Sequence, residues 1–378
     1  MPPDETASPA AGEASRIWLI VGDRLGDNAQ AENLMAGLGR PYERRYVRVV
    51  DPWVKGKPKV IPSLHHLDLD ASDKLQAPWP DVVVTVGRRL SMVAQWIRKQ
   101  SGGATRIVLV GKPSGPTSPY SLIITSAEVQ MPPAANVHRI GLPLLRVDES
   151  RVKEAADQWR ERFEKLPRPL VGILIGGPTN PFVFNPGVTN DLLDIANQVV
   201  ARGGTPYFTT SPRTPPEATA ALKRDLPAGA QFFEWRRGAP DNPYHALLGL
   251  ADEFVVTGES ISMLVEVAKL GRPLAIFPLP FGWWGKLDQY RRRAARWLYA
   301  PPAGTRLDAV RLVLRDIGQF LHLLPRTRDF TAVHRLLIDR GLAVPAGGAI
   351  PPPRGEVPDD LPAAVGRVLA LLDEKPGG

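Results

Sequence analysis

A predicted helix start around Gly258 carries the side chains best suited to chemistry. An apolar run at residues 254–256 predicts a strand that ends at Gly258, and apolar residues at helical spacing follow it. Ser260 and Ser262 are good caps for this helix, whose free N–H groups and positive dipole end favour a phosphate. Glu266 lies about a turn and a half further along, at a distance suited to holding a ribose. The same residues would also suit an ordinary helix cap with a solvated glutamate.

Three further loops follow predicted strands in the same half of the chain. Strands predicted at residues 170–175, 205–210 and 231–233 lead respectively into Gly176-Gly177, into Ser211 with Arg213, and into Glu234-Trp235. Ligands of open α/β sheets bind at the carboxyl ends of the strands, so we expect these loops to converge on one binding site. The candidate binding residues are Gly176, Gly177, Ser211, Arg213, Glu234, Trp235, Gly258, Glu259, Ser260, Ser262 and Glu266. The structural alternatives are a tight turn at the glycine pair, a surface arginine, and a capped loop with a packed tryptophan.

The first predicted strand, at residues 16–22, leads into a loop that contains Asp23 and Asp27, and a second strand is predicted at residues 46–50. Gly22 and Gly26 let the backbone approach a ligand, but their spacing matches neither a dinucleotide fingerprint nor a P-loop. Transfer to a hydroxyl acceptor needs a general base, which a carboxylate in such a loop can supply. Asp23 and Asp27 are therefore the candidate catalytic residues, although Asp23 would also suit the cap of the following helix.

Metal chemistry has little support in the sequence. The chain has no cysteine, which excludes disulfides, a thiol nucleophile and a cysteine-ligated metal. His65, His66, Asp68 and Asp70 have the side-chain types of metal ligands, but histidine and aspartate in loops are usually just solvated. We expect neither a metal site nor a bound cofactor.

The net charge of +8 favours anionic partners such as nucleotides or lipid head groups. No zinc finger or RNP-type motif is present, so nucleic acid is not an expected partner. No apolar run reaches the ~20 residues that span a bilayer, and the N-terminus has neither the basic start nor the apolar core of a signal peptide. We therefore expect a cytoplasmic protein.

A segment rich in tryptophan and arginine indicates contact with a membrane surface. Trp283 and Trp284 precede a basic helix that contains Arg291, Arg292 and Arg293. Aromatic and basic side chains together suit the head-group region of a bilayer, so we expect peripheral contact with the inner membrane through these residues. A packed loop followed by a solvated helix is the alternative.

The chain shows the strand–helix alternation twice, which predicts two Rossmann-like domains with parallel sheets. Its 378 residues are enough for two hydrophobic cores. We predict a disordered tail at residues 1–15, an N-terminal domain at 16–150, a C-terminal domain with added helices at 151–340, and a Pro/Gly-rich tail with a short helix at 341–378.

Together these motifs resemble the mitochondrial-fission ("elongated mitochondria") family in its bacterial branch. The resemblance runs from about Ile17 to Pro280, with the motifs in the family's order. The residues that carry it are Asp23, Gly26, Asp27, Asn28 and Gln30; Gly176-Gly177-Pro178; Thr209, Thr210, Ser211, Arg213 and Thr214; Asn242-Pro243-Tyr244; and Val256 to Ser260 with Ser262, Met263 and Glu266.

The family is similar to GT-B glycosyltransferases. The resemblance therefore implies an α/β fold of GT-B type, with two Rossmann-like domains whose parallel sheets face a central cleft. It implies metal-independent transfer of a sugar from a nucleotide-sugar, expected to be of UDP type, bound by the C-terminal domain. The acceptor would lie on the N-terminal domain and would be a lipid-linked or envelope glycan.

The resemblance also assigns roles within the donor site. Backbone N–H groups of Gly176, Gly177 and the helix start would meet the diphosphate, and Arg213 would neutralise a phosphate. Glu266 would form hydrogen bonds with the ribose hydroxyls, and the chain near Glu234-Trp235 would lie along the edge of the base.

Two other functions fit the same residues. A nucleotide-sugar epimerase of GT-B type would share the donor site. The plant relatives are regarded as recruiters of a division protein, which implies an interaction protein that kept the fold and lost catalysis. The intact phosphate-type loops favour the enzyme.

Overall fold

The computed structural model describes residues 15–23, 25–54, 59–300, 304–320 and 327–374. The chain divides into two compact units, and each is described by itself. Unit 1 consists of residues 1–125, 134–140 and 360–378, and unit 2 consists of residues 126–133 and 141–359. The tail predicted at residues 1–15 lies outside the described residues except for Ser15.

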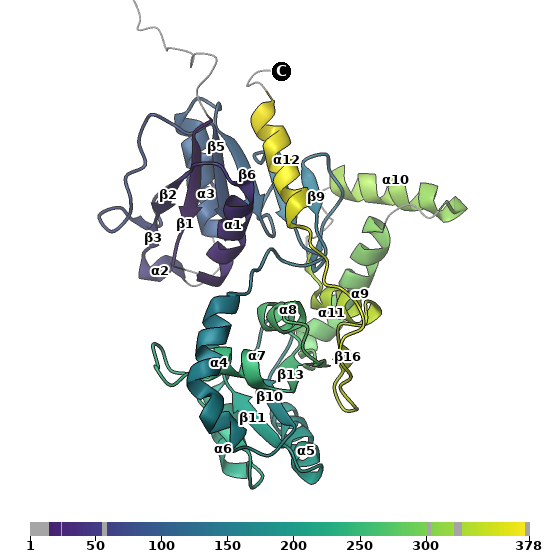
Figure 1. Cartoon of the computed structure of the whole chain (residues 1–378). Coiled ribbons are helices and arrows are strands. Elements are labelled where there is room, and N and C mark those ends of the chain that lie inside the picture. Colours follow the sequence, from purple (N-terminus) through teal and green to yellow (C-terminus); the bar gives the residue numbers. More distant parts are fainter. Residues whose placement is uncertain (1–14, 24, 55–58, 301–303, 321–326, 375–378) are drawn as a thin grey trace, which may run out of the picture. The chain divides into compact units, whose positions relative to one another are not determined.

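Unit 1 is built on a six-stranded parallel sheet (Figure 1). Its elements are β1 (Ile17–Val21), α1 (Leu25–Leu38), β2 (Glu43–Tyr46), β3 (Arg48–Val49), α2 (Asp51–Val54), β4 (Leu67–Asp68), β5 (Val82–Val86), α3 (Gly87–Gln100), β6 (Arg106–Val110), β7 (Leu122–Thr125), β9 (Val137–Arg139) and α12 (Leu361–Asp373). The strand order is β2-β1-β5-β6-β7-β9, with every pairing parallel. All residues of β1 and β5 are buried, as expected of central strands covered on both faces.

Unit 2 contains a second six-stranded parallel sheet and a larger set of helices. Its elements are β8 (Val129–Gln130), α4 (Glu149–Glu164), β10 (Leu170–Leu174), α5 (Pro186–Ala201), β11 (Thr205–Thr209), α6 (Pro216–Asp225), β12 (Gln231–Phe233), α7 (Tyr244–Leu250), β13 (Glu253–Thr257), α8 (Ile261–Lys269), β14 (Leu274–Phe277), α9 (Trp283–Tyr299), α10 (Arg306–Phe320), β15 (Thr327–Arg328), α11 (Phe330–Asp339) and β16 (Val344–Pro345). The strand order is β12-β11-β10-β13-β14-β16. β8 and β15 form a separate antiparallel pair.

The two parallel sheets confirm the predicted fold class of two Rossmann-like α/β domains. The C-terminal helix α12 belongs to unit 1, where it packs against α1 and β7 (Figure 1, yellow). Among the residues described, no helix combines the length and the apolar character needed to cross a bilayer.

The second strand of unit 1 differs from the prediction. Tyrosine and valine at residues 46–50 predicted a strand there, but β1 pairs with Glu43–Tyr46 instead. This strand lies at the edge of the sheet, where charged side chains protect the exposed backbone, so its pattern is not apolar. Of the valines that suggested a strand, Val47 is buried between β2 and β3, and Val49 lies in β3, which pairs with β4.

Candidate functional site

The carboxyl ends of β10, β11 and β13 lie side by side in unit 2, because β10 pairs with both of the other strands. The loops that follow them are joined by hydrogen bonds. The amide of Gly176 donates to Oγ1 of Thr257 at 2.8 Å, and Oγ of Ser211 donates to the carbonyl of Gly176 at 2.9 Å. Oγ1 of Thr214 donates to the same carbonyl at 2.5 Å. These hydrogen bonds join three loops from distant parts of the sequence at the carboxyl edge of the sheet.

Gly176 and Gly177 have no room for a side chain. A Cβ on Gly176 would lie 1.8 Å from Oε1 of Glu259, and one on Gly177 would lie 2.0 Å from the carbonyl oxygen of Arg213. The amide of Gly177 donates to Oε1 of Glu259 at 2.8 Å, so both glycine amides are already bonded to side chains of this edge. A diphosphate bound here would therefore accept backbone hydrogen bonds from the N–H groups at the neighbouring start of α8.

Glu259 carries the buried carboxylate of the site, and the residue is only 3% exposed. Its Oε1 accepts from Gly177 and, at 3.2 Å, from Oγ1 of Thr257. Its Oε2 is buried and has no hydrogen-bond partner within the described part of the chain. Burial raises the pKa of Glu259, although the Gly177 amide and the charge of Arg213 oppose that rise. The carboxylate fixes the loop and leaves one oxygen available to a proton or a ligand donor.

Helix α8 begins directly after this carboxylate. Ser260 precedes the helix and makes no side-chain capping hydrogen bond, so its hydroxyl does not occupy the first-turn N–H groups. Ser260 is buried, whereas Ser262 is exposed on the first turn. Nε2 of His334 donates to the carbonyl of Gly258 at 2.5 Å, and the His334 ring would meet a Cβ on Gly258 at 2.7 Å. The imidazole of α11 therefore fixes the turn that leads into α8.

Glu266 is oriented by a tyrosine. Oη of Tyr244 donates to Oε2 of Glu266 at 2.6 Å, and both side chains are half-buried. Burial raises the pKa of Glu266, and burial together with the nearby Glu266 raises the pKa of Tyr244 well above its ordinary value. The bond to Oε2 sets the direction of the carboxylate and leaves Oε1 for another donor.

The remaining predicted donor-site residues lie on the loops after β11 and β12. The exposed Arg213 donates from Nη1 to Oγ1 of Thr179 at 2.5 Å. Glu234 is exposed and forms an ion pair with Lys223. Trp235 is half-buried, and its amide donates to Oγ1 of Thr210 at 2.8 Å. Arg213 thus has an exposed guanidinium held by the glycine loop, while Glu234 and Trp235 lie beside the end of β12.

The sequence interpretation gave no role to three side chains that organise this edge: Thr257, Tyr244 and His334. Thr257 and Tyr244 lie within the motifs that carry the family resemblance, and that was the available signal. His334 lies in an ordinary amphipathic helix, and nothing in its local sequence indicates a contact with Gly258.

Asp23 lies after β1 in unit 1 and is exposed. Oη of Tyr46 donates to its Oδ1, and the amide of Val49 donates to its Oδ2 at 3.3 Å. Asp23 is thereby oriented by its neighbours on the β2–β3 turn, and the hydrogen bond to Asp23 raises the pKa of Tyr46.

Asn28, rather than Asp23, ties the start of α1 back to the strand. Its Nδ2 donates to the Gly22 carbonyl at 2.6 Å, and its Oδ1 accepts from the Gly22 amide at 3.2 Å. Asp27 belongs to the first turn of α1, but its side chain lies outside the described residues.

The histidines and aspartates at residues 65–70 make contacts within unit 1. His65 contacts Trp53, His66 is buried with Nε2 donating to the Arg89 carbonyl at 3.0 Å, and Oδ1 of Asp68 accepts from the amide of Ala71. In the described ranges, no three His, Asp or Glu side chains lie close enough to hold one metal ion.

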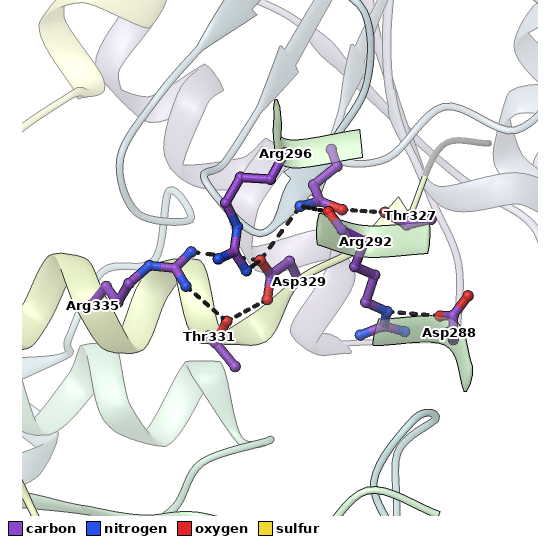
Figure 2. A network of polar contacts seen from close by, with 8 residues as sticks. Asp288, Arg292, Arg296, Thr327, Asp329, Thr331 and Arg335 are labelled. Atoms are coloured by element: carbon purple, nitrogen blue, oxygen red, sulfur yellow. Dashed lines mark hydrogen bonds and ion pairs between the residues drawn. The ribbon is translucent and has the colours of Figure 1, made fainter. Parts of the chain in front are cut away.

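The predicted membrane-contact residues on α9 separate into two sets. Trp283 and Arg293 are exposed, and Arg291 is exposed while paired with Asp288. Arg292 is only 7% exposed and its Nε donates to Oδ2 of Asp288 at 2.7 Å, as Figure 2 shows. The prediction was therefore wrong for Arg292, because its side chain is buried and paired with Asp288. The side chain of Trp284 lies outside the described residues.

A sequence profile of the family described as "Mitochondrial fission ELM1" matches residues 26–306. Mitochondrial fission protein ELM1 of Arabidopsis thaliana is 26% identical over 219 residues, which are 52% of this chain and 51% of the plant protein. The chain thus spans about half the length of that relative. Protein RP120 of Rickettsia prowazekii (strain Madrid E) is 22% identical over 303 residues, which are 70% of this chain and 83% of that protein. A solved structure of UDP-GlcNAc 2-epimerase from Methanocaldococcus jannaschii is similar with a TM-score of 0.46 and 11% identity, over 96% of this chain and 94% of that one.

Proposed function

This chain belongs to the mitochondrial fission ELM1 family, and we propose that it is a glycosyltransferase of GT-B type that works without a bound metal. It transfers a sugar from a nucleotide-sugar, expected to carry UDP, to an acceptor hydroxyl. The observation that carries the proposal is the edge of the unit 2 sheet, where the glycine loop, Glu259 and Thr257 are bonded together beside the start of α8. Carboxyl edges of open α/β sheets are where such ligands bind.

The donor would be held by groups whose directions are already set. First-turn N–H groups of α8 and the guanidinium of Arg213 would bind the diphosphate, since helix starts and arginine both favour phosphate. The free oxygen of Glu266 would accept a hydrogen bond from a ribose hydroxyl, and Trp235 and Glu234 would contact the edge of the base. As the sugar–oxygen bond breaks, negative charge grows on the leaving diphosphate, and these fixed positive groups stabilise that charge.

The acceptor hydroxyl would lose its proton to Asp23. The carboxylate is exposed and is oriented by Tyr46 and the Val49 amide, which suits a general base. Asp27 remains the second candidate. We propose a lipid-linked or envelope glycan as the acceptor, reached at the cytoplasmic face of the inner membrane by peripheral contact through Trp283, Arg291 and Arg293.

The test is a calorimetric titration of the purified protein with UDP, GDP, ADP and their sugars, without added metal. We expect saturable binding of one nucleotide, and loss of that binding in Glu266→Ala and in Arg213→Ala. Matched controls are Glu154→Ala and Arg160→Ala, two exposed positions on α4, which should bind the nucleotide as the unmodified protein does.

Two outcomes would redirect the assignment. If no nucleotide binds, the donor site fails and the chain is better regarded as an interaction protein. If a nucleotide-sugar binds and is converted to its epimer rather than transferred, the reaction is that of an epimerase on the same site.

A further inference from the structure

Helix α9 presents an aromatic stripe to solvent. Trp283, Tyr290 and Trp297 recur every seven residues, which keeps them within about 40° of one another around the helix. Their exposed fractions range from 46% to 71%, unusually high for such large side chains. Lys286 and Arg293 are exposed on the same side of the helix, next to this stripe.

The opposite face of α9 is fixed to the rest of unit 2. Nη2 of Arg296 lies 2.5 Å from Oδ2 of the buried Asp329, and Nε2 of Gln130 donates to the carbonyl of Arg292 at 3.2 Å. Thr331 also bonds to Asp329, and Arg335 lies 3.5 Å from the same carboxylate (Figure 2). Burial raises the pKa of Asp329, but the bonds from Thr331 and the two arginines hold that pKa below its ordinary value. The charged network therefore holds the helix in place, and the aromatic stripe is not needed for packing in this unit.

Helix α10 packs against α9 and also carries apolar side chains on its exposed face. These are Leu307, Val310, Val313, Leu314 and Ile317, with exposed fractions from 48% to 67%. At helical spacing they occupy an arc of about 120°, as wide as the buried face of an ordinary amphipathic helix. Arg311, on the other side of α10, is buried and lies 2.7 Å from Asp308.

We propose that α9 and α10 together form a lipid-binding surface, with the apolar arc of α10 inserting among the acyl chains of an anionic bilayer. The aromatic stripe of α9 would lie at head-group level, where tryptophan and tyrosine are favoured. Lys286, Arg291 and Arg293 would attract the anionic head groups. The inference deepens the membrane contact of the proposed function by adding the inserting face, and it does not depend on sugar transfer.

Two observations select a bilayer rather than a protein as the occupant. The exposed residues combine an apolar arc with an aromatic stripe and exposed basic side chains, which is the pattern of helices that lie in the membrane interface. The chain's net charge of +8 adds a long-range attraction to anionic lipid.

The experiment is vesicle flotation of the full chain with phosphatidylcholine vesicles, made with and without phosphatidylglycerol. We expect binding to the anionic vesicles, and about a tenfold or larger loss of partitioning in the double variant Leu314→Ser with Ile317→Ser. Arg293→Gln should weaken binding to anionic vesicles only, and added salt should reduce its effect. The matched control is Ile61→Ser with Leu69→Ser, the same substitutions at exposed positions of unit 1, which should float like the unmodified protein.

Circular dichroism and the nucleotide titration establish that each variant is folded. Flotation of the α10 double variant equal to that of the unmodified protein overturns the inference. A second result also overturns it: the protein binds no vesicles, and in sedimentation the unmodified chain is an oligomer while the double variant is a monomer. The apolar arc is then a contact between copies of the chain. Nucleotide binding without vesicle binding removes this inference alone, and vesicle binding without nucleotide binding removes the proposed function alone.

Discussion

The loops that follow the first strand of each sheet differ in how their polar groups are held. After β10 in unit 2, the glycine loop is enclosed: Glu259 is buried and bonds to the Gly177 amide. After β1 in unit 1, the loop is open: Asp23 is exposed and bonds to Tyr46 and the Val49 amide. The loop after the first strand is therefore held in unit 2 by a buried carboxylate from the loop after β13, whereas in unit 1 it carries an exposed carboxylate of its own.

The difference follows from the cost of burying charge. A buried carboxylate needs hydrogen-bond donors, and unit 2 supplies them from loops far apart in the sequence, which fixes the loops relative to one another. An exposed carboxylate is solvated, so the unit 1 loop is under no such constraint. A rigid edge suits a donor that carries a diphosphate, whereas an open loop suits proton transfer with an acceptor of variable shape. This contrast fits the proposed function, in which unit 2 binds the donor and unit 1 supplies the general base, and the following substitutions test that proposal.

The largest effect is expected from Asp23→Asn in unit 1. If Asp23 is the general base, the substitution lowers turnover of the donor identified by calorimetry by about 10²–10⁴-fold and leaves nucleotide affinity unchanged. Asp70→Asn, at another exposed aspartate of the same unit, serves as the control and should turn over normally. A lower nucleotide affinity in Asp23→Asn, with turnover intact, would contradict the division of roles.

The second test places the same change in both loops. Gly177→Ala puts a methyl group 2.0 Å from the Arg213 carbonyl oxygen, so we expect a loss of about 3 kcal/mol of unfolding free energy together with nucleotide binding. Gly26→Ala has no atom within 4 Å of the added Cβ and lies in helix α1, so it should stabilise the protein by about 0.5–1 kcal/mol. Chemical denaturation measures both. Equal effects at the two positions would remove the contrast between the enclosed and the open loop.

A smaller effect is expected from Tyr244→Phe, which removes the hydroxyl that orients Glu266. The stability lost should be about 1 kcal/mol, and the dissociation constant of the nucleotide should rise by about threefold to tenfold. Tyr120→Phe is the matched change in unit 1, where Nε2 of Gln95 donates to the buried Tyr120 hydroxyl at 3.2 Å. That variant should lose similar stability with no change in nucleotide affinity. Equal nucleotide affinities in the two variants would indicate that Glu266 does not depend on Tyr244.

Local sequence patterns were enough to predict both sheets. Apolar runs such as residues 170–175 and 254–256 and the helical spacing after Ser260 predicted the order of strands and helices along the chain. The charged edge strand β2 was misplaced because its residues do not show an apolar alternation. The packing of α12 against α1 could not be inferred either, since more than 300 residues of chain separate the two helices and each has many possible partners.

The positions of the candidate loops were predictable, but the hydrogen bonds between them were not. Glycine and serine after successive strands indicated the loops at the carboxyl edge of the sheet. The bond from the Gly177 amide to Glu259 joins residues 82 positions apart, and the bond from Tyr244 to Glu266 joins residues 22 apart. Neither pairing leaves a local pattern, because tertiary packing alone decides which donor meets which carboxylate.

The smallest effect concerns His334, which is half-buried in unit 2 and donates to the Gly258 carbonyl. Burial lowers its pKa below the ordinary 6.5, so the unfolded chain binds a proton more readily than the folded chain. Its contribution to stability is therefore complete above about pH 6.5 and is lost as the pH falls toward the lower folded pKa. His334→Gln keeps a side-chain donor and has no proton to gain, so its unfolding free energy should fall less steeply on acidification.

The comparison again has a counterpart in unit 1. His65→Gln, the same substitution at an exposed position of unit 1, serves as the control for the substitution itself. Denaturation between about pH 8 and about pH 5.5 measures all three proteins. If His334→Gln and His65→Gln lose stability with the same slope as the unmodified chain, then the imidazole does not hold the turn before α8, and the rigidity assigned to the donor edge must come from Glu259 and Thr257 alone.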